Sequence, residues 1–126
     1  DLKSFILSLP FGLLTANILF SNELPDLEDD RKAGKLNWVS LTGPQHAYLL
    51  YLVLLLSGFF AVAVGVSLGY LRPLAILSFI SIIPAFKAAQ ILKARYQEKD
   101  ALVESSKLTI MAQTMTSLVL IVSVLL

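Results

Sequence analysis

Four long apolar stretches account for most of this chain of 126 residues. A helix needs about 20 mostly apolar residues to cross the hydrocarbon core of a bilayer, so each stretch is predicted to be a spanning helix. The fold class expected is all-α: a polytopic transmembrane bundle with four spanning helices. The composition agrees, because 56% of the residues are hydrophobic and only 15% are charged, and soluble domains are less apolar and more charged. The predicted spans are residues 5–24, 47–68, 74–92 and 108–126.

The composition also excludes several classes of function. Ten Lys and Arg against nine Asp and Glu give a net charge of +1, which provides no basis for binding nucleic acid. The chain has no cysteine, so disulfides, thiol catalysis and cysteine-ligated metals are excluded. Its single histidine, His46, rules out a metal site built on a pair of histidines.

The basic residues are divided unequally between the two sides of the predicted bundle. Lys3 and Arg72 fall on one side, and the other eight fall on the opposite side. Because positive loops stay in the cytoplasm, residues 26–45 and 93–107 are predicted to face the cytoplasm, with both chain ends on the far side. The chain opens at Asp1 without an initiator Met, so we expect the sequence to begin partway through a longer protein. The eight basic residues on the predicted cytoplasmic side are Arg31, Lys32, Lys35, Lys87, Lys93, Arg95, Lys99 and Lys107.

The segment 22–35 carries the residues best suited to chemistry. If the first helix continues through it, with a kink at Pro25, Asn22, Asp26 and Asp30 recur at i, i+4 and i+8 on one face, and Asp29 lies nearby. Carboxylates this close repel one another unless a cation compensates their charge. The pattern therefore predicts a stripe of oxygen ligands where the first span meets the cytoplasmic surface.

Mg²⁺ suits such a stripe, because it takes hard oxygen ligands and bridges carboxylates to substrate phosphates. Arg31 and Lys35 follow directly and are predicted to hold the phosphate oxygens. The chemistry indicated is departure of a diphosphate whose charge is neutralised by metal and cationic side chains. The alternative is a solvated loop between two helices, since charge runs often simply sit in water.

This segment resembles the second aspartate-rich motif of the UbiA superfamily of intramembrane prenyltransferases. The matching residues are Asn22, Asp26 and Asp30, followed by Arg31 and the stretch 33–35. Within the superfamily the stretch is most similar to the menaquinone branch, which prenylates 1,4-dihydroxy-2-naphthoate. Asp29 does not belong to the family pattern.

The resemblance implies Mg²⁺-dependent transfer of a polyprenyl group from its diphosphate to an aromatic acceptor, in a prokaryotic cell membrane. It implies that residues 1–126 are a partial UbiA-type domain, the last four of nine spanning helices. Asp26, Asp30 and Asn22 match metal-binding positions, and Arg31 and Lys35 fall where the diphosphate is expected. The partners implied are membrane lipid, a polyprenyl diphosphate and the aromatic acceptor; the catalytic base is not indicated.

The first aspartate-rich motif of the family has no counterpart in this chain. The other acidic residues, Asp1, Glu98, Asp100 and Glu104, do not form a second such pattern. We therefore expect the rest of the site upstream in the parent protein or on a partner chain. The alternative function is a non-enzymatic membrane subunit that uses the acidic stripe as a cation or docking site.

Four other residues and one segment carry structural predictions. Tyr51 is expected in the aromatic belt at the membrane interface. Lys87 is expected to reach the headgroups with its long side chain, the alternative being that it faces the diphosphate. Gly58 and Gly65 are expected to allow close helix packing. Residues 90–105 are interpreted as a helix lying along the membrane surface.

Overall fold

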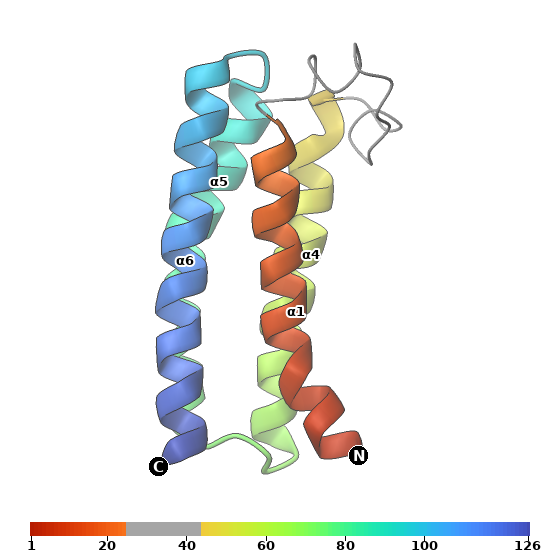
Figure 1. Cartoon of the computed structure of the whole chain (residues 1–126), viewed down its shortest axis with the longest axis vertical. Coiled ribbons are helices and arrows are strands. Elements are labelled where there is room, and N and C mark those ends of the chain that lie inside the picture. Colours follow the sequence, from red (N-terminus) through yellow and green to blue (C-terminus); the bar gives the residue numbers. More distant parts are fainter. Residues whose placement is uncertain (25–43) are drawn as a thin grey trace.

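The computed structural model describes residues 1–24 and 44–126, and all regular structure within these ranges is helical. This confirms the all-α prediction. Figure 1 shows a bundle of long helices, with both chain termini at the same end. The elements are α1 (Leu2–Glu23), the 3₁₀ helix η2 (Pro44–His46), α4 (Ala47–Ser67), the 3₁₀ helix η3 (Pro73–Ser81), α5 (Ile82–Ala94) and α6 (Lys99–Leu125).

Within the described ranges, four helical segments are long and apolar enough to cross a membrane: Leu2–Glu23, Ala47–Ser67, Pro73–Ala94 and Lys99–Leu125. Large apolar side chains cover the outside of the bundle, and Phe60 and Ile83 are each 71% exposed. Small and polar residues such as Ala88 and Ser105 fill much of its interior. This arrangement suits a lipid-facing surface, so the protein is an integral membrane protein with four candidate spans.

Helices α5 and α6 form an antiparallel hairpin, and the prediction of a surface helix over residues 90–105 is wrong. The chain turns within Arg95–Glu98, and α6 begins at Lys99, well before the predicted start of the fourth span. Leu92 and Ala101 are fully buried, and the Ser105 hydroxyl donates a hydrogen bond to the Ala88 carbonyl at 3.1 Å. Leu92 and Leu102 of this stretch therefore lie inside the bundle, whereas Val103 stays exposed.

Two glycines of α4 allow close packing, Gly58 in the middle of the helix and Gly65 near the end of the bundle that holds the termini. A Cβ on Gly58 would lie 3.0 Å from Leu14 of α1, and a Cβ on Gly65 would lie 2.9 Å from Leu71. Both glycines therefore serve the close packing predicted for them. Gly69, with a φ of 77°, then turns the chain from α4 toward η3, in a conformation that favours glycine.

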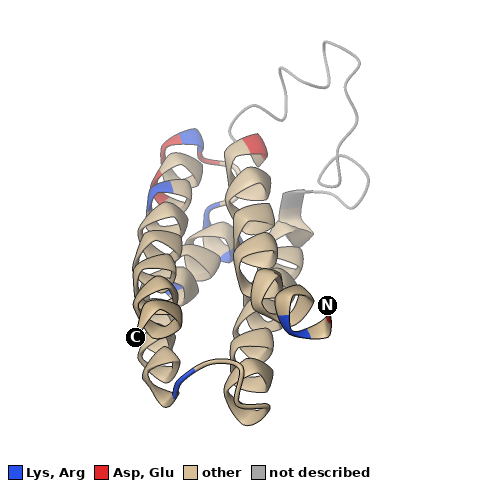
Figure 2. Ribbon diagram, turned by 60° about the horizontal axis from the view of Figure 1, so that its bottom comes forward, with Lys and Arg blue, Asp and Glu red and all other residues tan. Residues whose placement is uncertain are grey.

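Charged residues gather toward the two ends of the bundle, leaving its middle largely apolar (Figure 2). Lys3 lies in the first turn of α1 and Arg72 caps η3, both at the end that holds the termini. Lys93, Arg95 and Lys99 lie at the opposite end, around the turn from α5 to α6. We call this opposite end, where α1 finishes, the motif end.

Candidate functional site

Asn22, the first residue of the aspartate-rich motif, lies in the last turn of α1 at the motif end. Its side chain is exposed, and α1 ends one residue later at Glu23, with Leu24 as the C-cap. Asp26, Asp30, Arg31 and Lys35 lie outside the described residues. Their assignment to a metal and a diphosphate therefore stays a prediction, as does the role of Asn22.

Helix α6 contacts the motif at Asn22. The hydroxyl of Ser106 donates a hydrogen bond to the side-chain carbonyl oxygen of Asn22, across 84 positions of sequence. Ser106 is only 8% exposed, so the donor comes from inside the helix contact. A carboxamide oxygen has two lone pairs, and the one that Ser106 leaves free is a hard oxygen ligand of the kind Mg²⁺ takes. Asn22 therefore fits the role of a metal ligand.

A cluster of hydroxyl groups lies directly behind the last turn of α1. The Thr109 side-chain oxygen lies 2.6 Å from the Tyr51 hydroxyl and 3.5 Å from the Ser21 hydroxyl. Thr109 donates its own hydrogen to the Ser105 carbonyl at 2.8 Å, so it accepts from both Tyr51 and Ser21. All four residues are buried. The cluster joins α1, α4 and α6 through hydrogen bonds in the buried interior of the bundle.

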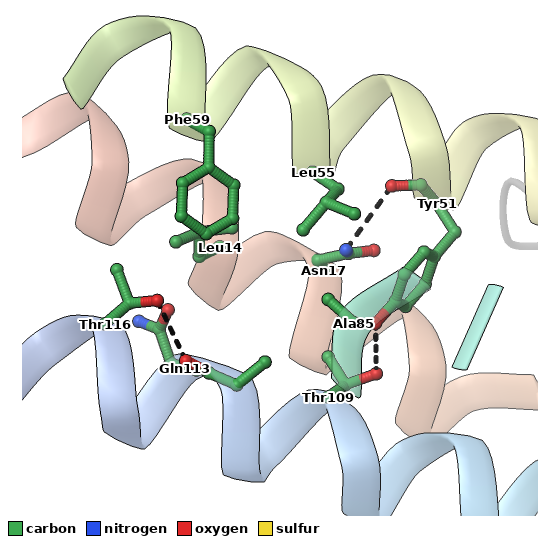
Figure 3. A pocket seen from close by; sticks show the side chains of 10 residues that line it. Leu14, Asn17, Tyr51, Leu55, Phe59, Ala85, Thr109, Gln113 and Thr116 are labelled. Atoms are coloured by element: carbon green, nitrogen blue, oxygen red, sulfur yellow. Dashed lines mark hydrogen bonds between the residues drawn. The ribbon is translucent and has the colours of Figure 1, made fainter. Parts of the chain in front are cut away.

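Tyr51 is completely buried, so its predicted place in the interfacial aromatic belt is wrong. Figure 3 shows its ring reaching between the helices toward Thr109. The prediction considered only how deep Tyr51 lies in the membrane. Its burial depends instead on the helix face that carries it, because Tyr51 lies on the same face of α4 as Leu55 and Phe59, which are also buried.

Deeper in the bundle, Asn17 lies on α1 one turn before Ser21. Its side-chain amide donates to the Tyr51 backbone carbonyl at 3.4 Å, while its own carbonyl oxygen has no partner (Figure 3). Asn17 lines a narrow cavity with Gln113 and Thr116, with room for about one water molecule. Polar side chains thus continue from the motif end toward the middle of the bundle.

The sequence analysis missed Ser106, Thr109 and Asn17 as members of this polar layer. A signal was present, because Ser105, Thr109 and Thr116 recur at spacings of four and seven on one face of an otherwise apolar segment. Polar residues at membrane depth either join helices or serve function.

Basic side chains border the motif end from the α5–α6 hairpin. The Lys93 ammonium lies 5.5 Å from the centre of the Tyr48 ring, a cation–π contact that ties α5 to the start of α4. Arg95 pairs with Glu98, whose hydrogen bond and charge raise the pKa of Arg95. Lys87 is exposed on the outer face of α5 beside Phe86, a position compatible with the predicted reach toward the headgroups.

An apolar groove follows the contact between α1 and α4, which we call the α1–α4 groove. It consists of two open hollows of about 540 Å³ and about 350 Å³. Their α1 residues follow one another at spacings of three and four, so both hollows lie along one face of that helix. The second hollow ends at Glu23, next to Asn22. The α1 residues are Ile6, Leu9, Leu13, Ala16, Leu19, Phe20 and Glu23.

Within residues 1–24 and 44–126, no three His, Asp or Glu side chains come close enough to hold a metal ion. Any metal site at the motif end therefore needs ligands from residues 25–43 or from another part of the protein.

Comparison with known proteins gives one family and two curated relatives. The model of the UbiA prenyltransferase family matches residues 1–121. The relatives are both called UbiA prenyltransferase domain-containing protein 1: the mouse protein (Mus musculus) is 44% identical and the human protein (Homo sapiens) 42% identical, each over 50 residues. The aligned stretch is 40% of this chain and only 15% of each relative. No solved structure matches the chain.

Proposed function

The chain belongs to the UbiA prenyltransferase family, and from that premise we propose that it supplies the second aspartate-rich half of a polyprenyl transfer site. The reaction is transfer of a polyprenyl group from its diphosphate to an aromatic acceptor. We propose 1,4-dihydroxy-2-naphthoate as the acceptor, which places the protein in menaquinone biosynthesis in a prokaryotic cell membrane.

The position of Asn22 carries this proposal. The motif begins on the last turn of α1, at the end of the bundle where basic residues gather. Asn22, Asp26 and Asp30 would bind Mg²⁺ through oxygen atoms, and Arg31 and Lys35 would hold the diphosphate. Mg²⁺ held by these residues would neutralise the charge that develops on a departing diphosphate.

The α1–α4 groove supports the choice of a polyprenyl substrate. It is apolar along α1 and ends beside the motif, so a prenyl tail lying in it would place its diphosphate at the motif end. The allylic carbon–oxygen bond then breaks, and the diphosphate leaves with the electron pair. Apolar walls keep water from the allylic cation. The ring carbon that bears the acceptor's carboxylate attacks the cation, and the carboxylate leaves as CO₂, its bond pair restoring aromaticity.

The rest of the site belongs to residues outside this chain, in the first half of the same protein or in a partner chain. In this proposal residues 1–126 form the last four of nine spanning helices, with the motif facing the cytoplasm. The count of basic residues supports that orientation.

Carboxylate variants test the proposed chemistry. In the full-length protein, Asp26→Asn should lower Mg²⁺-dependent transfer from a polyprenyl diphosphate by a factor of about 10²–10³. The variant removes a metal-binding charge and changes little in volume. Asp29→Asn is the matched control and should keep its activity, since Asp29 lies outside the family pattern. Near wild-type activity of Asp26→Asn would overturn the proposal and favour a non-enzymatic subunit.

Labelling of introduced cysteines tests the orientation, and the absence of cysteine from this chain simplifies the experiment. A cysteine at Ser40 should resist a membrane-impermeant maleimide added to intact cells, whereas a cysteine at Tyr70 should react. The reverse pattern would show that the motif faces outward.

A further inference from the structure

The last turn of α1 is held by two residues of α6 that lie one turn apart. Ser106 donates a hydrogen bond to the Asn22 carboxamide oxygen. Thr109 accepts a hydrogen bond from Ser21, the residue just before Asn22. Contacts to two consecutive α1 residues fix both the position of this turn and the side chain that it presents.

Thr109 is itself held in place from two other directions. It accepts a hydrogen bond from the Tyr51 hydroxyl of α4 at 2.6 Å and donates to the Ser105 carbonyl of α6 at 2.8 Å. Ser21, Tyr51 and Ser105 are all fully buried. The support behind the turn is therefore a closed network of hydrogen bonds, in which each hydroxyl hydrogen has an assigned acceptor.

We propose that Ser106 is a positioning residue for the metal-binding motif, acting through Asn22, and that Thr109 holds the turn on which Asn22 lies. An exposed asparagine side chain ordinarily samples several rotamers. The bond from Ser106 occupies one lone pair of the carboxamide oxygen and holds the other in a fixed direction, where a divalent cation can use it. This inference rests on the proposed function, because it takes Asn22 to be a metal ligand.

Hydrogen-bond partners of metal ligands typically change metal affinity by about 10- to 100-fold when they are removed. Ser106 donates a neutral hydrogen bond, so we expect an effect of about tenfold, the lower end of that range. The effect should fall on metal affinity and not on the transfer step at saturating metal, because Ser106 does not touch the substrate in this account.

The first experiment compares Ser106→Ala with wild type in the full-length protein in detergent. The variant should bind Mn²⁺ about tenfold more weakly, measured by electron paramagnetic resonance without substrate, and should need about tenfold more Mg²⁺ for half-maximal transfer. Its kcat at saturating Mg²⁺ should stay at the wild-type value. Wild-type Mn²⁺ affinity of Ser106→Ala would overturn the inference.

Three further variants separate positioning from general structure. Ser123→Ala removes a buried hydroxyl of α6 that has no partner, at the opposite end of the bundle, and should leave Mn²⁺ affinity unchanged. Ser106→Thr keeps the hydroxyl and should restore binding. Ser106→Cys keeps the side chain's size with a weaker donor and should lose affinity in the same direction as Ser106→Ala, which guards against an effect of folding.

A double-mutant cycle with Asn22→Ala tests whether Ser106 acts through Asn22. In the Asn22→Ala background, Ser106→Ala should cause no further loss of Mn²⁺ affinity; an equal further loss would show that Ser106 acts by another route. If Asp26→Asn loses Mn²⁺ binding but Ser106→Ala does not, only this inference fails. If Asp26→Asn keeps both Mn²⁺ binding and transfer, the proposed function fails first.

Discussion

The two ends of the bundle are held together in different ways. At the motif end, hydroxyl and amide groups of α1, α4 and α6 hydrogen-bond across the helices, from Ser106 and Asn22 to Tyr51 and Thr109. At the end with the termini, close packing depends on a glycine: Gly65 has no side chain, so Leu71 can pack directly against its backbone.

Hydrogen bonds at the motif end orient a side chain, whereas glycine packing at the other end only brings the helices close together. A hydrogen bond is directional, so the polar network sets the orientation of the turn that presents Asn22. Packing of glycine against leucine is not directional but contributes dispersion contacts over a close helix approach. Changes at the motif end should therefore alter metal binding and transfer, and changes at the other end should alter stability.

The largest effect is expected from Asp30→Asn at the motif end. Loss of a metal-binding carboxylate should lower the transfer rate of the full-length protein by a factor of about 10²–10³, the range seen when one group that stabilises developing charge is removed. The thermal unfolding temperature should stay close to wild type. A large loss of stability with normal transfer per folded molecule would contradict the assignment of metal binding to the motif end.

Gly58→Leu is expected to lower stability and to leave metal binding unchanged. A side chain at Gly58 meets Leu14, whose nearest atoms lie 3.0 Å from the added Cβ, and overpacking of this kind costs about 1–3 kcal/mol. The free energy of unfolding should fall, while Mn²⁺ affinity of the folded protein stays unchanged.

Gly12→Ala is the matched control for Gly58→Leu. No atom lies within 4 Å of a Cβ built on Gly12, so this variant should be neutral or stabilise helix α1 by about 0.5–1 kcal/mol. Equal destabilisation by both variants would contradict the close-packing role of Gly58. Both are measured by thermal unfolding in the same detergent.

Ala16→Trp tests whether a prenyl tail lies in the α1–α4 groove, which runs between the two ends of the bundle. The large ring would fill the hollow that Ala16 lines with Phe20 and Leu50, so transfer from long polyprenyl diphosphates should fall by about tenfold or more relative to short ones. Ile80→Trp changes an exposed position on η3, outside the groove, and should leave the preference unchanged. A fall that is equal for all chain lengths would argue against a prenyl tail in the groove.

Tyr51→Phe should have the smallest effect. It removes one hydroxyl from the Thr109 network, and side-chain hydrogen bonds between membrane helices contribute about 0.6 kcal/mol on average. We expect a small fall in unfolding temperature with a rise of a few-fold in the Mg²⁺ concentration for half-maximal transfer. An unchanged Mg²⁺ requirement would confine Tyr51 to a packing role.

The sequence predicted the spans better than the contacts between them. Hydrophobic length alone located the four spans, and the second begins at Ala47 as predicted. The fourth begins earlier than predicted, because Lys99, Asp100 and Glu104 interrupt the apolar pattern while Ala101 and Leu102 still pack inside. Charge on one face of a helix does not end the helix.

The polar layer behind the motif was not predictable in the same way. The contact between Ser106 and Asn22 joins residues that are 84 positions apart, and local spacing cannot show which α6 face meets α1. The motif was visible because its residues recur locally at helical spacing. The residues that support it became visible only in the folded bundle.

We propose that the acidic motif that begins at Asn22 binds a divalent cation and, through it, a prenyl diphosphate. The most direct test is a structure of the full-length protein with Mn²⁺ and a non-reactive prenyl thiodiphosphate, using the anomalous signal of manganese. We predict manganese bound by Asp26 and Asp30, with the diphosphate against it at the motif end. Manganese and diphosphate bound together away from both aspartates would contradict the account.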